Sequence, residues 1–132
     1  MRVLLSIRPV HVESILSGAK RFEFRRRMFT RRDVRSVLIY CTMPVGRLVA
    51  EFEIAGILED TPEGLWARTS EASGITRDFY DAYFEGRDRA FALAIGELNV
   101  FETPIAPDEM IDDFTPPQSY RYVSPQRQLS LL

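Results

Sequence analysis

The chain has 132 residues, a length that fits one domain with a single hydrophobic core. Its composition, 45% hydrophobic and 27% charged, excludes intrinsic disorder of the whole chain. The formal net charge of -2 at pH 7 argues against indiscriminate binding of nucleic acid. One cysteine excludes an internal disulfide, and with one histidine it leaves too few ligands for a closed zinc site.

The N-terminal segment 1–16 is expected to belong to the folded domain rather than to a targeting signal. Its apolar run is too short for a secretory signal, and it has no small-residue cleavage site. No stretch of the chain approaches the length of a membrane span. We therefore expect a cytoplasmic protein that makes no membrane contact and carries neither a metal nor a cofactor.

The first elements expected are a strand, a short helix and a second strand. Residues 2–7 form an apolar run of strand length, and Pro9 and Gly18 then mark the start and the end of a helix. The sequence "KRFEFRRR" alternates, which predicts a half-buried strand. Lys20 has the same parity as Phe22 and Phe24, so it is expected to point toward the buried side of this strand.

Further along, residues 36–42 are predicted to form a strand and residues 46–60 a long strand or a bent pair of strands, with a hairpin loop, "MPVG", between them. Thr61 is a plausible N-cap of one helix, and a second helix is expected from about Thr76 to Phe84, ending at Gly86. The aromatic residues of both helices are expected to pack in the core. Residues 89–102 alternate again, and Gly96 within them suggests a bulge or a bend. The segment after Pro116 is expected to be extended, with a fraying end.

These elements amount to five or six strands and three helices, without regular alternation of strand and helix. That pattern predicts an α+β fold, a small mixed β-barrel with flanking helices. We expect one domain over residues 1–123 and a C-terminal tail over 124–132.

The basic residues are unevenly placed. Of seventeen, only Lys20 is a lysine, and eight lie between Lys20 and Arg35, where the acidic residues are Glu23 and Asp33. A basic segment on an acidic body can dock an anion while the rest of the surface repels polyanions. A lone lysine among arginines suggests a need for a compact amine that can lose its proton when desolvated. The alternative is an ordinary solvated basic surface.

Several stretches together resemble the ASCH domain of the PUA-like superfamily: "LLSIRP", "ILSGAKRFEFRR", "VLIYCTMPVGRLVAEFEI", "RAFALAIGEL" and "PPQSYRYV". The most specific element is G-x-K-x-x-E-x-R, formed by Gly18, Lys20, Glu23 and Arg25. The resemblance implies a PUA-like barrel whose cleft binds RNA or a nucleobase, so the expected partner is RNA or a nucleoside or nucleotide. The candidate ligand-binding residues are Ser6, Arg8, Lys20, Glu23, Arg25, Gln118, Ser119 and Tyr120.

Other assignments remain open. Some ASCH proteins are N4-acetylcytidine amidohydrolases and others are described as ribonucleases, so Lys20 and Glu23 would be the catalytic pair in an enzyme. Glu23 stands where the amidohydrolases have a threonine. Arg26, Arg27, Arg31 and Arg32 are candidate phosphate contacts. Glu23 and Arg25 could instead form a surface ion pair, Ser6 could simply cap the helix, and the domain could be a protein-interaction module.

Overall fold

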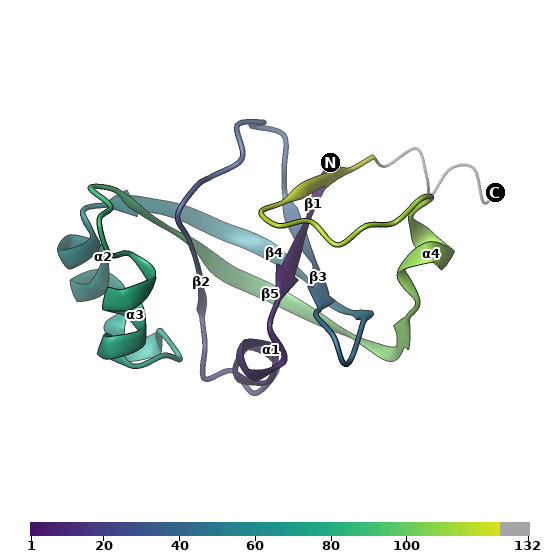
Figure 1. Cartoon of the computed structure of the whole chain (residues 1–132), viewed down its shortest axis with the longest axis horizontal. Helices are drawn as coiled ribbons and strands as arrows, with labels where there is room; N and C mark the ends of the chain where they lie inside the picture. Colours follow the sequence, from purple (N-terminus) through teal and green to yellow (C-terminus); the bar gives the residue numbers. More distant parts are fainter. Residues whose placement is uncertain (125–132) are drawn as a thin grey trace.

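The computed structural model describes residues 1–124 and is built on one six-stranded mixed sheet with strand order β2-β5-β4-β3-β1-β6 (Figure 1). The strands are β1 (Arg2–Ile7), β2 (Phe22–Arg25), β3 (Ser36–Cys41), β4 (Arg47–Asp60), β5 (Ala90–Ile105) and β6 (Arg121–Val123). The predicted tail beyond residue 124 lies outside the described residues. The α+β prediction is confirmed.

The N-terminal unit follows the sequence pattern. β1 pairs in parallel with β3, and α1 (Pro9–Leu16) begins at the expected proline. Val12 and Ile15 are its buried residues and join the core under the sheet. The Gly18 backbone has a φ of +86°, which a glycine adopts without strain, so the chain turns there toward β2.

The middle of the sheet is the long antiparallel arrangement of β3, β4 and β5. The predicted hairpin loop joins β3 to β4, and the register shifts along the β4–β5 ladder between Phe52 and Gly56. Gly96 of β5 lies opposite these shifts, and a Cβ atom there would lie 2.9 Å from the Glu53 carbonyl oxygen. The predicted bulge is thus confirmed, and the residue at position 96 must be small.

Helices cover one end of the sheet. α2 (Pro62–Thr69), the short 3₁₀ helix η1 (Ser70–Ala72) and α3 (Arg77–Tyr83) lie together in Figure 1, near the ends of β4 and β5. Thr61 caps α2 as predicted, because its hydroxyl accepts from the backbone amide of Gly64. Thr76, expected as the first residue of the second helix, is instead its N-cap and accepts from the Phe79 amide. A short helix, α4 (Pro107–Met110), was not predicted.

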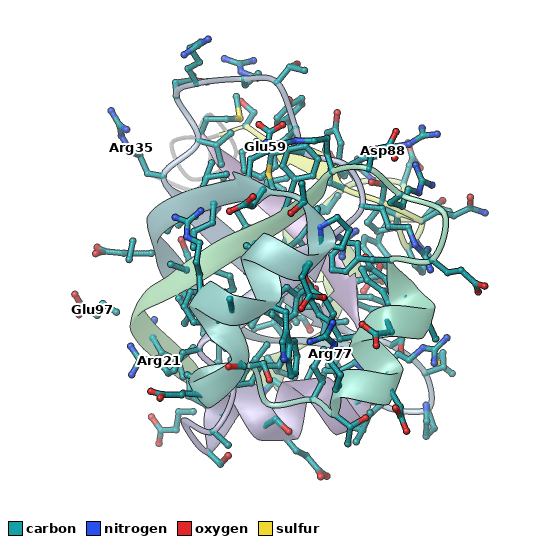
Figure 2. The ribbon with its side chains drawn as sticks, turned by 90° about the vertical axis from the view of Figure 1, so that its left-hand side faces the viewer. Arg21, Arg35, Glu59, Arg77, Asp88 and Glu97 are labelled. Atoms are coloured by element: carbon teal, nitrogen blue, oxygen red, sulfur yellow. The ribbon has the colours of Figure 1, made fainter. Side chains whose placement is uncertain are left out.

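Apolar side chains form three clusters. The largest includes Phe52 and Ile95 under the sheet, the second includes Leu4 and Leu48 near α4, and the third packs the helices on the sheet around Tyr80 and Phe84. Figure 2 looks onto the α2 and α3 end and shows Arg77 between those two helices. Arg77 pairs with Glu63 and Asp81, so ion pairs bridge α2 and α3 outside the third cluster.

The predicted barrel is not confirmed, because the sheet is not closed. In residues 1–124 the edge strands β2 and β6 form no ladder with each other. Side chains join the two edges instead: Arg25 of β2 donates to the Ser119 carbonyl just before β6. The Tyr122 hydroxyl accepts from the amides of Thr30 and Arg31. With only four and three residues, β2 and β6 are short for a closing ladder.

Candidate functional site

The approach to β2 is fixed by contacts with the turn between η1 and α3. The Arg21 amide donates to the Ala72 carbonyl at 2.8 Å, and the Lys20 ammonium donates to the Ser73 carbonyl at 3.3 Å. Gly74, with a φ of +70°, lies so close that a Cβ on it would be 2.4 Å from the Cβ of Lys20. The turn therefore determines where Lys20 lies.

Lys20 is almost completely buried, with 3% of its surface exposed. Its ammonium lies 4.7 Å from the centroid of the Phe24 ring, which confirms that Lys20 points to the same side as that phenylalanine. Burial lowers the pKa of Lys20 from its ordinary value of 10.5, while the nearby Glu23 charge opposes the shift. A buried ammonium of this kind gives up its proton more readily than a surface lysine.

Glu23 and Arg25 form an ion pair, with Arg25 Nη1 3.3 Å from Glu23 Oε2. The side chains are only 9% and 14% exposed respectively, so this is not the surface pair considered above. Arg25 also donates through Nη2 to the Ser119 carbonyl. The guanidinium is therefore held by the second edge of the sheet while it faces Glu23.

These residues line one pocket of about 380 Å³, which falls within the size range of small-ligand sites. Five of the candidate ligand-binding residues come together in its wall: Ser6, Arg8, Lys20, Glu23 and Arg25. They come from the end of β1, the start of α1 and β2. Because β2 is an edge strand, residues of both parities reach the pocket, including Lys20 and Phe24 on one side and Glu23 and Arg25 on the other.

Ser6 is not the cap of α1. The N-cap is Arg8, without a side-chain cap bond, and the buried Ser6 hydroxyl oxygen has no hydrogen-bond partner in the described structure. Most buried hydroxyls in proteins are hydrogen-bonded, so an unpartnered one in a pocket wall is well suited to a ligand.

Helix residues complete the pocket, and the sequence reasoning did not place them there. The α3 side supplies Ile75, Phe79, Ala82 and Tyr83, and α1 supplies His11, which lies edge-on to Phe79 with centroids 5.1 Å apart. Burial lowers the pKa of His11, and the Lys20 charge adds to this effect. The signal available in the sequence was a second row of aromatic residues at helical spacing, Phe79 and Tyr83, beside the core row.

The C-terminal candidates lie elsewhere. Gln118, Ser119 and Tyr120 are not part of the pocket wall. Tyr120 packs on the core and contacts the rings of Phe29 and Tyr122. Ser119 takes part through its carbonyl oxygen, which receives the Arg25 bond. Ser119 therefore supports Arg25 from outside the pocket.

The candidate phosphate-contacting arginines differ in whether their side chains already have partners within the protein. Arg26 lines the pocket, donates through Nε to the Tyr83 carbonyl at 2.7 Å, and lies 4.1 Å from the Tyr83 ring centroid. Arg31 is paired with Asp33. Arg27 and Arg32 are exposed. We call residues 26–35 the arginine loop.

Within residues 1–124, no group of three or more His, Cys, Asp or Glu side chains is arranged to hold a metal ion. In the same part of the chain, no helix combines the length and apolar character that crossing a membrane requires. Among the described residues, the charged side chains of the pocket wall are the Glu23 carboxylate, the Lys20 ammonium and the guanidinium groups of Arg8, Arg25 and Arg26.

Comparisons with known proteins, by sequence and by structure, find similarity to a protein with an ASCH domain. An ASCH domain-containing ribonuclease from Zymomonas mobilis is 27% identical over 132 residues, covering 98% of this chain and 88% of that protein. The crystal structure of ASCH from Zymomonas mobilis has a TM-score of 0.89 at 27% identity, covering 98% of this chain and 92% of that one. The N-terminal domain of Staphylothermus marinus McrB, at 12% identity and a TM-score of 0.58, shares the fold alone.

A further relative shows the same region inside a longer protein. The large ribosomal subunit protein uL22 of Ureaplasma parvum is 26% identical over 102 residues, which cover 77% of this chain and 33% of that protein. The family model of the ASCH domain matches residues 5–101, well over half of the sequence, including the end of β1 and all of α1, β2, β3 and β4. The chain therefore belongs to the ASCH domain family.

Proposed function

We propose that this domain binds single-stranded RNA with one nucleotide in the pocket, and that it cleaves the RNA there. The observation that carries the proposal is the burial of Lys20 beside the Glu23–Arg25 pair in one nucleotide-sized pocket. Ion pairs with no role are normally left in solvent, since burying charges is costly. The likeness to an ASCH domain-containing ribonuclease over nearly the whole chain supports the same activity.

Each polar residue has a role in this reaction. The Glu23 carboxylate takes the proton of a ribose 2′-hydroxyl, and the 2′-oxygen attacks the neighbouring phosphorus. The bond from phosphorus to the 5′-oxygen of the next nucleotide breaks, and the Lys20 ammonium donates its proton to that oxygen. Arg25 and Arg8 stabilise the negative charge on the nonbridging oxygens. The products are a 2′,3′-cyclic phosphate end and a 5′-hydroxyl end.

The lowered pKa of Lys20 fits the role of the acid. A buried ammonium is a stronger acid than a surface one, so it protonates a leaving alkoxide more effectively near neutral pH. Arginine cannot take this role, because its guanidinium does not lose a proton in proteins. This difference accounts for a single lysine in a chain that otherwise uses arginine.

The test is to incubate the protein with a short single-stranded RNA and analyse the products by mass spectrometry. We expect fragments with cyclic phosphate ends, about 100-fold or more slower formation with Glu23→Gln, as for loss of a general base, and no rescue by Lys20→Arg. Arg68→Gln, at an exposed position in the last turn of α2 and outside the pocket wall, is the control and should cleave normally.

Two other outcomes would contradict the cleavage step. Saturable RNA binding that weakens in Lys20→Ala, without any product, would identify an RNA-binding domain that is not a nuclease. A mass change on N4-acetylcytidine with intact RNA would identify an amide hydrolase, in which Glu23 acts in place of the threonine of such enzymes.

A further inference from the structure

One face of α3 lies in the pocket, and its most exposed aromatic residue is Phe79. Phe79, Ala82 and Tyr83 are spaced three and four residues apart, which places them on the same side of the helix. Tyr80 and Phe84 point in another direction and are buried in the third cluster, against which Tyr83 also packs. Phe79 is 41% exposed, so its ring contributes little to the stability of that cluster.

Phe79 is nevertheless held in place. The His11 ring of α1 meets it edge-on at 5.1 Å with an interplanar angle of 64°. Thr76 caps the first turn of α3 and fixes the backbone of Phe79, because the Phe79 amide donates to the Thr76 hydroxyl. By contrast, the ring of Tyr83 is already covered by the Arg26 guanidinium at 4.1 Å. Phe79 is thus the pocket aromatic that combines a fixed position with an accessible ring.

The two walls of the pocket differ in chemistry. The wall from β1 and β2 is polar and holds Ser6, Lys20, Glu23 and Arg25, whereas the α3 wall is apolar and aromatic. A nucleotide has the same division, with a charged phosphate and a flat base. An RNA strand that places its phosphate on the polar wall therefore brings a base to the α3 wall.

We propose that Phe79, positioned by His11, is a stacking platform for one unpaired base, and that it makes the cleft select single-stranded RNA over duplex. This inference rests on the proposed function. A base within a duplex is paired and stacked on both neighbours, so its face is not available to an aromatic side chain. Stacking on an aromatic ring tolerates all four bases, since each has a π face.

The experiment measures binding of a short fluorescent 2′-O-methyl RNA, single-stranded or as a hairpin duplex, which lacks the attacking hydroxyl and stays intact. We expect Phe79→Ala to weaken single-strand binding roughly 5- to 100-fold and to leave the weak duplex binding unchanged. Ile57→Ala removes a half-exposed apolar side chain outside the pocket and is the matched control. Thermal unfolding of each variant verifies that it is folded.

A spectroscopic signal separates stacking from a general structural effect. Trp66 is the single tryptophan of the sequence, so Phe79→Trp in a Trp66→Phe background places one indole at the platform. Its fluorescence should be quenched by the single strand and not by the duplex. His11→Phe should retain binding because it keeps the edge contact, and His11→Ala should weaken it.

The outcomes distinguish the two proposals. If the unmodified protein neither binds RNA nor cleaves it, the proposed function and the platform are both wrong. If RNA binding is weakened by Arg25→Gln but unchanged in Phe79→Ala, with no quenching at position 79, the platform alone is wrong. Equal loss of single-strand and duplex binding in Phe79→Ala would also overturn the proposed selectivity.

Discussion

At the scale of single residues, the pocket holds a charge where the fold does not require one. The Lys20 ammonium is buried against the Phe24 ring and the Ser73 carbonyl, and its aliphatic chain fills space that an apolar side chain of similar length would also fill. Residues kept for chemistry commonly reduce stability, because they are arranged for a ligand and not for the unliganded fold. Lys20 has the properties of such a residue.

We therefore expect Lys20→Met to stabilise the protein at pH 7, by about 1 kcal/mol in the free energy of unfolding, since a desolvated charge is replaced by an apolar chain. Cleavage should be lost. Arg87→Met, at an exposed position whose side chain makes no hydrogen bond or ion pair within residues 1–124, is the control and should leave stability almost unchanged. Urea denaturation measures all three proteins. A loss of stability in Lys20→Met would mean that the ammonium is a structural group.

The same residue predicts a pH dependence. Because burial lowers the pKa of Lys20, the unfolded chain binds its proton more tightly than the folded chain between the lowered pKa and 10.5. The contribution of Lys20 to stability therefore rises with pH across that window. Urea titrations from pH 7 to pH 10.5 should show the advantage of Lys20→Met shrinking as pH rises. A constant difference would contradict a lowered pKa.

At the scale of elements, the site depends on how the turn between η1 and α3 meets β2. Three contacts join them: the Arg21–Ala72 backbone bond, the Lys20–Ser73 bond and the close approach of Gly74 to Lys20. At the other end of α3, the Tyr83 hydroxyl donates to the Phe24 carbonyl at 3.2 Å. The aromatic wall is thus attached to the polar wall at both ends.

Two glycines allow this dependence to be tested. Gly74 and Gly86 both have positive φ, but a Cβ at Gly86 meets nothing within 4 Å. Gly86→Ala should cost about 1–2 kcal/mol of stability from backbone strain alone and leave RNA cleavage intact. Gly74→Ala should cost about 1–3 kcal/mol more, from steric overlap with Lys20, and should impair cleavage. Thermal unfolding and cleavage assays compare them, and equal effects of the two substitutions would show that the turn does not position Lys20.

Local features of the elements were predictable, whereas their assembly into a site was not. The cap at Thr61, the hairpin after β3 and the irregularity at Gly96 depend on short-range patterns and are confirmed. The pocket wall on α3 depends on tertiary packing. Both faces of α3 carry aromatic residues, so helical spacing alone cannot tell the core row at Tyr80 and Phe84 from the pocket row at Phe79 and Tyr83.

In the G-x-K-x-x-E-x-R pattern, too, a local feature was predictable from the sequence and a tertiary one was not. Its alternation predicted the direction of Lys20, but not that Glu23 on the other parity would also be buried beside the pocket. That result follows from the edge position of β2, which is set by long-range pairing with β5. The open sheet has a similar origin, because nothing in the short segment 121–123 specifies whether it pairs with β1 or with β2.

At the scale of the whole molecule, the net charge of -2 combines a basic segment with an acidic remainder. The basic segment begins at Lys20, passes along the pocket and continues into the arginine loop. The Tyr122 hydroxyl braces this loop through the amides of Thr30 and Arg31, and the Arg31 guanidinium lies 5.6 Å from the Tyr122 ring centroid. Contacts with Tyr122 therefore fix part of the arginine loop in position beside the pocket.

A basic loop fixed beside the pocket predicts that the binding of RNA to this protein depends on salt concentration. Arg26 is engaged with Tyr83 and Arg31 with Asp33, so we expect Arg27 and Arg32 to make most of the phosphate contacts. Each contact with a single strand contributes about 0.7 to the slope of log affinity against log salt concentration. The double variant Arg27→Gln/Arg32→Gln should therefore reduce the slope by about 1.4 and weaken binding of all sequences alike.

The matched control for this prediction is Arg47→Gln/Arg68→Gln, which makes the same change in net charge at exposed positions of β4 and α2. Long-range effects of net charge would lower affinity equally in both double variants, whereas phosphate contacts would distinguish them. Fluorescence anisotropy titrations of single-stranded RNA at several salt concentrations give both slopes. If the two slopes fall by the same amount, the arginine loop contributes only to the general field of the protein, and RNA is bound by the pocket alone.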